Sequence, residues 1–124
     1  MILHLPFIIK KMEWSELKLF IKDKVFLIGI TIIDKNDQLI EEYQTSGTVK
    51  ELTDEGIIKF IRPDNSLFQM PYDKESIRLA APGEYREKET GQVIVNPDYI
   101  TIWTYKIKDI EHLKKIKSCG YLKE

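Results

Sequence analysis

Few side chains in this sequence could ligate a transition metal. The nitrogen and sulfur candidates are His4, His112 and Cys119, whereas a structural zinc site takes four ligands in closely spaced pairs. His112 and Cys119 lie about two helical turns apart and cannot chelate one ion together. The acidic turn at residues 34–37 lacks the spacing of acids, glycine and distal glutamate that a calcium hand requires. We therefore predict no metal site and no cofactor.

The sequence also offers little for catalysis. It has no glycine-flanked nucleophilic serine, and it has no cysteine placed close to a histidine by its spacing. Glu84 with Glu87 or Glu89 could form a carboxylate pair for acid and base work. Arg86 and Lys88 alternate with these acids, however, which is typical of an exposed hairpin. We expect no catalytic residues and a domain that is not an enzyme.

The side chains best suited to binding lie in a strand-like segment near the C-terminus. Alternation along a strand separates its aromatic from its aliphatic residues. One face holds Tyr99, Trp103 and Tyr105, and the other holds Ile100 and Ile102. We expect the isoleucine face to enter the core, which leaves the aromatic face to point outward. Because Tyr and Trp are frequent in binding hot spots, this face is the candidate binding surface.

Tyr85 and Arg86 extend this predicted binding patch, because the hairpin that carries them is expected beside the aromatic strand. The alternative is that the C-terminal helix or residues 1–11 cover the aromatic face and bury its rings. The two possibilities differ in whether Trp103 is accessible.

Charge is unevenly distributed along a chain whose net charge is −1. Residues 34–55 contain seven acids and two lysines, a local −5, and residues 106–124 contain six lysines and three acids, a local +3. Glu41 and Glu42 are the candidates for an acidic surface. Opposite charges at two ends of the fold indicate either solvated surface or a region that meets a charged partner.

Hydrophobic periodicity and turn residues define the elements that must position these side chains. Helices are predicted at residues 13–22 and 109–118, the second with Asp109 as N-cap and Gly120 after its end. Strands are predicted at residues 25–33, 39–49, 57–61, 67–70, 78–80, 84–89, 92–95 and 99–107. Residues 71–77 read as a single 3₁₀ turn, and Gly47 marks a bend or bulge in the second strand.

This order of elements predicts a mainly β fold with α+β character at its margins. We expect an SH3-like partly open barrel or a strongly bent antiparallel sheet with an added hairpin, in which the first five strands form a meander. We expect residues 12–124 to form one domain and residues 1–11 to form an apolar N-terminal extension, which lacks the charge order of a signal peptide. A single cysteine excludes an internal disulfide, which favours a cytoplasmic protein.

Two resemblances accompany this prediction. Residues 24–81 resemble an SH3-like small barrel in architecture, a fold whose members bind peptides or nucleic acids or serve structural roles. The turns and aromatic residues that follow resemble small bacterial proteins; these residues are Pro82-Gly83-Glu84-Tyr85-Arg86, Thr90-Gly91, Asn96-Pro97-Asp98 and Trp103. Neither resemblance implies an activity or a site.

Three classes of function remain open from the sequence. A domain that binds another protein, including an immunity-type inhibitor of a bacterial toxin, fits the near-neutral charge and the aromatic face. Nucleic-acid binding would use those rings with Lys106 and Lys108, but a pI near 6.2 disfavours it. A small-molecule carrier or an enzyme fits least. No segment has the length of a membrane span, and the edge of residues 39–48 could pair with a second copy, although Glu41 and Glu42 oppose this.

Overall fold

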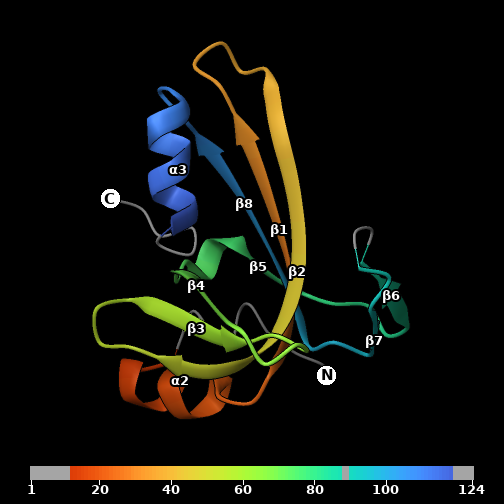
Figure 1. The fold of residues 1–124 in the computed structure, drawn as a ribbon. Coiled ribbons are helices and arrows are strands. Elements are labelled where there is room, and N and C mark those ends of the chain that lie inside the picture. The colour runs from red at the N-terminus through yellow and green to blue at the C-terminus, as the bar shows by residue number, and fades with distance from the viewer. Residues whose placement is uncertain (1–11, 88–89, 119–124) are drawn as a thin grey trace.

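A computed structural model describes residues 12–87 and 90–118 of the chain (Figure 1). The elements are α2 (Trp14–Ile21), β1 (Val25–Ile33), β2 (Leu39–Leu52), β3 (Ile57–Ile61), β4 (Leu67–Pro71), the 3₁₀ helix η1 (Lys74–Ser76), β5 (Ile77–Leu79), β6 (Glu84–Arg86), β7 (Val93–Val95), β8 (Tyr99–Lys106) and α3 (Ile110–Ser118). The predicted mainly β class, with the added hairpin and a short helix on either side of the strands, is confirmed.

Six of the strands form one mixed sheet in the order β4-β3-β2-β1-β8-β5, and β6 and β7 form a separate hairpin. β1 to β4 are the predicted antiparallel meander. The prediction that β5 completes this meander is wrong, because β5 pairs with β8 instead. β8 itself pairs in parallel with β1, so the sheet is not purely antiparallel. The sheet ends at β4 and β5 and does not close into a barrel.

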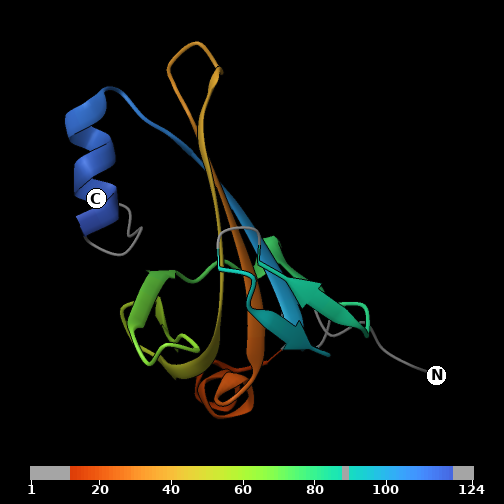
Figure 2. The same cartoon turned by 45° about the vertical axis from the view of Figure 1, so that its right-hand side comes forward.

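β2 is shared between the two halves of the sheet. It pairs with β1 from Leu39 to Thr48 and with β3 from Thr48 to Leu52, and it curves between them (Figure 2). The irregularity predicted at Gly47 lies instead between Val49 and Glu51, where the register shifts. Gly47 serves another purpose: a Cβ built there would lie 2.8 Å from the Cβ of Phe60. Glycine is therefore required for the close approach of β3.

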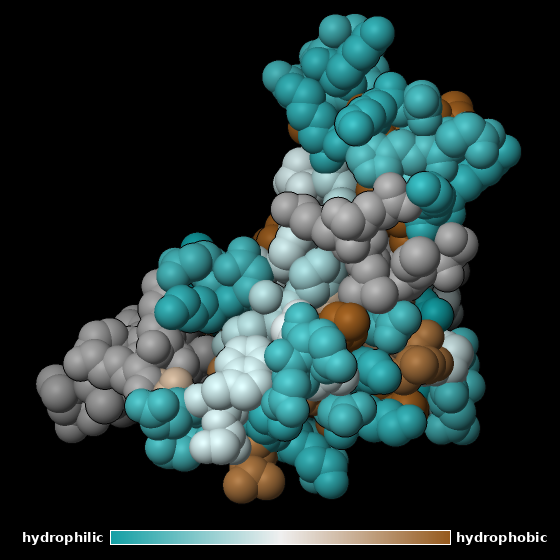
Figure 3. Space-filling view, turned by 90° about the vertical axis from the view of Figure 1, so that its left-hand side faces the viewer, coloured by the Kyte–Doolittle hydropathy of each residue, from teal (hydrophilic) through white to brown (hydrophobic). Residues whose placement is uncertain are grey.

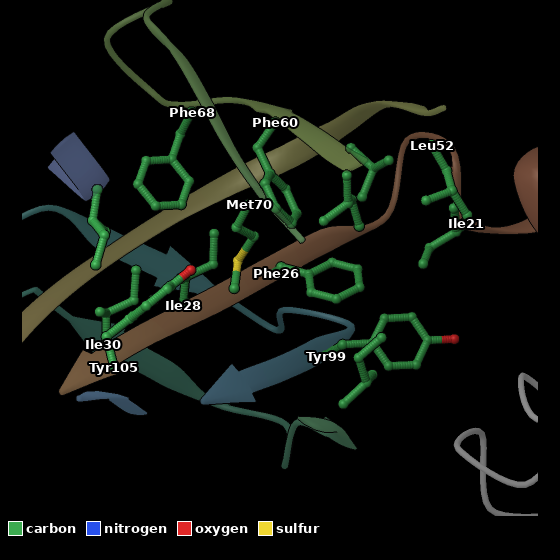
Figure 4. Packing of buried hydrophobic residues seen from close by; sticks show 14 of the residues in the cluster. Ile21, Phe26, Ile28, Ile30, Leu52, Phe60, Phe68, Met70, Tyr99 and Tyr105 are labelled. Atoms are coloured by element: carbon green, nitrogen blue, oxygen red, sulfur yellow. The ribbon is translucent and has the colours of Figure 1, made fainter. Parts of the chain in front are cut away.

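The hydrophobic core lies on one face of β1, which we call the core face. Phe26, Ile28, Ile30 and Ile32 alternate along the strand and are each almost completely buried. The Phe26 ring lies 5.3 Å from the Phe60 ring (Figure 4). The side chains that close the core come from both helices and from β2 to β5 and β8; they are Leu17, Ile21, Val49, Leu52, Ile58, Phe68, Met70, Ile77, Tyr99, Tyr105, Ile107 and Ile116.

The two helices close the core from different ends of β1 and β8. Leu17 and Ile21 are the buried residues of α2. The predicted N-cap of α3 is confirmed, because a side-chain oxygen of Asp109 accepts the backbone N–H of His112 at 2.9 Å. The predictions for residues 1–11, Cys119 and Gly120 lie outside the described residues. Among the residues described, no helix is both long and apolar enough to cross a bilayer.

Candidate functional site

The aromatic residues of β8 lie on the core face, with Tyr99 and Tyr105 buried and Trp103 half-buried, so the structure agrees with the alternative that this face is covered and not with an outward patch. Tyr99 and Tyr105 are 0% and 3% exposed, whereas Ile102 on the opposite face is 61% exposed. The reason is the position of β8 beside β1. Its register aligns Tyr99 with the core residue Phe26, at a ring separation of 5.1 Å.

Burial raises the pKa of two tyrosines, Tyr72 and Tyr99. Desolvation, with a smaller contribution from Asp73, raises the pKa of Tyr72 to about 12. Desolvation also raises the pKa of Tyr99, and Asp98 and Tyr72 add to the shift. Both hydroxyls are buried without a hydrogen-bond partner in the part of the chain that the structure describes. They are neutral at physiological pH and serve the core.

The outer face of β1 and β8, opposite the core, carries a groove that the β6–β7 hairpin partly covers. Figure 1 shows this hairpin and α3 on opposite sides of the three long strands. The groove has a volume of about 270 Å³. Its lining consists of Leu27, Ile28, Gly29, Gln44, Thr45, Tyr85, Arg86, Glu87, Ile94, Ile100 and Ile102. We call this the outer groove; its lining is mostly apolar.

Hydrogen bonds fix the hairpin over the outer groove. The carboxylate of Glu87 accepts one bond from the buried Ser46 Oγ at 2.9 Å and one from Thr90 Oγ1 at 2.8 Å. The Tyr85 hydroxyl donates to the carbonyl oxygen of Ala81 at 2.7 Å. Ile94 is 8% exposed and anchors the hairpin from β7. The groove is thus preformed, and its walls do not need to order when something binds.

The rim of the outer groove carries an arginine, Arg86, next to the carboxylate of Glu87. Arg86 is exposed, and its guanidinium donates to the backbone carbonyl of Gly91 at 3.2 Å. No carboxylate within residues 12–87 and 90–118 forms a salt bridge with it. The Glu87 carboxylate beside it is already occupied by two hydroxyl donors. Glu87 keeps its negative charge, so the rim holds one charge of each sign, and Arg86 is the group there that can pair with an acid of whatever binds.

A second, more polar hollow of about 240 Å³ adjoins the outer groove. The two share Gln44, Thr45 and Glu87. Its arginine is held by the fold: Arg62 donates from Nε to Ser66 Oγ at 2.8 Å and stacks over the Phe68 ring at 5.2 Å. This arginine is a packing residue and is poorly placed to receive a ligand.

The segregated charges of the sequence partly neutralise one another in the fold. Lys117 pairs with Glu41 at 2.7 Å, and Lys106 pairs with Asp37 at 2.9 Å. The prediction of an acidic surface is therefore wrong for Glu41, which is half-buried and ion-paired, whereas Glu42 is exposed. The physical reason is that α3 follows β8 and returns over the core face, where Glu41 points. No group of three potential metal ligands occurs among the described residues.

The face at the left of Figure 1 offers no comparable apolar surface. Its described residues are mostly hydrophilic, with hydrophobic side chains in small separate groups (Figure 3). Scattered apolar side chains of this kind are normal on protein surfaces. The outer groove thus remains the strongest candidate site.

Sequence reasoning found part of this site and missed the rest. Tyr85 and Arg86 were predicted to bind, and both line the outer groove, but Tyr99, Trp103 and Tyr105 lie on the other side of the sheet. The floor residues Ile100 and Ile102 were assigned to the core. Gly29 was the available signal, because a glycine within an apolar strand often marks a place where another group approaches.

Comparisons with known proteins find no match for this chain: no family model, no curated protein and no solved structure. The SH3-like resemblance accordingly stays a prediction, and any function has to be argued from the outer groove itself.

Proposed function

We propose that this protein is a non-catalytic binding domain, and that its outer groove receives an aliphatic side chain of a partner protein. The observation that carries the proposal is the outer groove: an apolar floor on the free face of a rigid sheet, with a tyrosine and an arginine at its wall. Tyrosine and arginine are enriched among residues that dominate protein interfaces, where they surround a desolvated anchor.

The size of the groove favours a side chain over a small-molecule cofactor. Its volume of about 270 Å³ lies at the lower limit of ligand pockets, which span roughly 300–1,000 Å³. Burial of a Leu, Ile or Val side chain contributes about 1.5–3 kcal/mol. An anchor of that kind needs additional contacts around the groove, and Ile102 and Val95, each 61% exposed, can supply apolar area there.

Arg86 at the rim suggests which residue type lies next to the aliphatic side chain in the partner protein. Because Arg86 has no described carboxylate partner, an aspartate or glutamate beside the aliphatic residue would pair with it. We therefore propose an acidic and aliphatic segment as the recognised element. A toxin neutralised by an immunity-type inhibitor is one partner of this chemistry, and the protein would then bind it from the cytoplasm of a bacterial cell.

Two observations make nucleic acid the weaker candidate. The aromatic rings that would stack with bases are buried: Tyr99 and Tyr105 are at most 3% exposed. Of the basic C-terminal segment, Lys106 and Lys117 are engaged by carboxylates of the same chain. The first feature removes the stacking with bases, and the second reduces the attraction to phosphates that nonspecific nucleic-acid binding requires.

The test fills the groove and asks whether binding is lost. Gly29 lies on the groove floor, and a Cβ there would meet only Ile102 Cγ1 at 3.8 Å, an ordinary contact. Peptides selected on the wild-type protein from a random linear library should contain an aliphatic residue near an acid. Their affinity should fall at least tenfold with Gly29→Val, whereas Thr31→Val, on the same face of β1 but outside the groove lining, should leave it unchanged.

Site-specific photo-crosslinking in cells addresses the natural partner. A benzoylphenylalanine in place of Val95, which is 61% exposed on β7 beside the groove, should capture a protein, and Gly29→Val should abolish that adduct. The same photoreactive residue in place of Leu19, which is 80% exposed on α2, should not capture it. Peptides or adducts that are indifferent to Gly29→Val would refute the groove as the binding site.

A further inference from the structure

We infer that the open edge of β8, from Ile102 to Lys106, pairs with the same edge of a second copy of this chain. The inference goes beyond the proposed function, because it concerns the edge of the sheet and not the outer groove. It predicts a dimer in which one sheet runs through both copies.

The edge is open because the ladder between β5 and β8 is short. That ladder covers only Tyr99 to Thr101 of β8, and it ends where Ile77 pairs with Thr101. The chain before Ile77 is η1, which contacts β8 through Ser76, whose Oγ lies 2.9 Å from Thr101 Oγ1, but which does not continue the ladder. On its other side β8 pairs with β1 along its whole length. Five residues of β8 thus have a neighbouring strand on one side only, among the residues that the structure describes.

The register identifies which backbone groups face outward along this edge. Ile107 donates its N–H to the carbonyl of Ile33 at 2.9 Å, so odd-numbered residues of β8 bond to β1. Ala80 donates to the carbonyl of Asp98 at 3.2 Å, so even-numbered residues face the β5 side. The N–H and C=O groups of Ile102, Thr104 and Lys106 therefore point away from β1. All three side chains are exposed, which leaves this edge accessible.

The composition of the edge lacks the usual devices that prevent strand addition. Natural edges are protected by proline, by bulges or by charged residues, lysine above all. Residues 102–105 have none of these, and they combine β-branched and aromatic residues that favour strands; Lys106 at the end of β8 is the one charged residue of this edge. The opposite edge, formed by β2 before Thr48, differs because it carries Glu41 and Glu42.

An antiparallel pairing of two β8 edges is self-complementary about Thr104. In that register Thr104 faces Thr104 of the second copy, and Ile102 faces Lys106, so no like charges lie opposite each other. The length also fits: the register ends where β8 ends at Lys106 and where β5 occupies the position beside Thr101. A two-fold axis perpendicular to the sheet relates the copies, which is an isologous interface.

The arrangement has a consequence for binding. Because the axis is perpendicular to the sheet, the outer grooves of both copies open on the same side. A partner that carries two recognised segments, or that is itself a dimer, would engage both grooves and gain from the high effective concentration of the second site.

The test first measures the mass of the protein in solution and then the register in which the two β8 strands pair. Sedimentation equilibrium of the full chain should give twice the mass of the 14.6 kDa monomer. Thr104→Pro removes the N–H that would donate across the axis in each copy, and should weaken the dimer about tenfold or more. Thr104→Val keeps this N–H and should leave the mass unchanged. Circular dichroism of Thr104→Pro shows whether the sheet is retained.

A disulfide tests the register directly. With Cys119→Ser as background, Thr104→Cys should form an intermolecular disulfide on mild oxidation, because residues on the axis approach within disulfide range. Thr31→Cys, its neighbour in register on β1, should remain monomeric under the same conditions. A monomeric wild type overturns the inference. A dimer that neither cross-links through position 104 nor responds to Thr104→Pro also overturns it, since its interface must lie elsewhere.

Discussion

The same substitution, glycine to alanine, should have opposite effects at two positions in adjacent strands. Gly29 lies in β1 and Gly47 in β2, and neither has the positive backbone angle that would strain any other residue. Their surroundings differ. A Cβ at Gly29 meets Ile102 Cγ1 at 3.8 Å on the outer face, whereas a Cβ at Gly47 lies 2.8 Å from Phe60 Cβ and 3.1 Å from the Ile61 carbonyl oxygen.

These distances give the sign and size of each effect. Gly29→Ala restricts the unfolded chain and adds an ordinary contact, so it should raise the free energy of unfolding by about 0.5–1 kcal/mol. Gly47→Ala forces β3 to move away from β2 and should lower it by about 1–3 kcal/mol, as overpacking generally does. The two variants should therefore differ by roughly 1.5–4 kcal/mol, the sum of these ranges.

Urea unfolding followed by circular dichroism measures this difference. The midpoints should move in opposite directions with similar slopes, because neither substitution changes much of the surface exposed on unfolding. A Gly47→Ala protein as stable as the wild type would contradict the close approach of Phe60. A Gly29→Ala protein that is strongly destabilised would show that the floor of the outer groove is covered, and would count against the proposed binding site as well.

Three further predictions concern individual polar side chains. Tyr72 should titrate near pH 12 in ultraviolet absorbance. Because folding raises the pKa of Tyr72, the neutral hydroxyl contributes to the free energy of unfolding below the ordinary pKa of 10.0, and this contribution is lost as the pH rises from 10 to 12. A double-mutant cycle with Glu41→Gln and Lys117→Met should give a coupling of about 0.2–1 kcal/mol that decreases with salt, since both side chains are about 40% exposed. Ser46→Ala removes a donor to Glu87 and should cost about 1–3 kcal/mol in the urea assay, with faster hydrogen exchange confined to the β6–β7 hairpin.

The local elements were predictable because local sequence specifies them. The turn before β2 has Asp34 accepting the N–H groups of Asn36 and Gln38 at 2.8 and 3.0 Å, as expected of an aspartate that opens a turn. Asn65 adopts a φ of 68°, a conformation that asparagine tolerates better than most residues. Such signals lie within a few residues of each other, so the sequence located β1, β3 and α3 to within a residue at each end.

The candidate site was predicted only in part, because only part of it depends on local sequence. Tyr85 and Arg86 lie in a short hairpin that nearby turn residues specify, and both line the outer groove. Which strand surface lies beneath them depends on β8, which pairs with a strand more than seventy positions earlier in the chain. No pattern within either segment encodes that pairing, so the floor of the groove was not predictable.

By itself, the sequence determined the kind of fold and the two sets of side chains on each strand. Alternation along β8 establishes that Tyr99, Trp103 and Tyr105 share one face and that Ile100 and Ile102 share the other. Only the tertiary structure decided which face enters the core. Both faces are apolar enough to be buried, so the choice depends on what covers each one: the aromatic face meets the Phe26 side of β1 and the helices, and the isoleucine face is left for the outer groove.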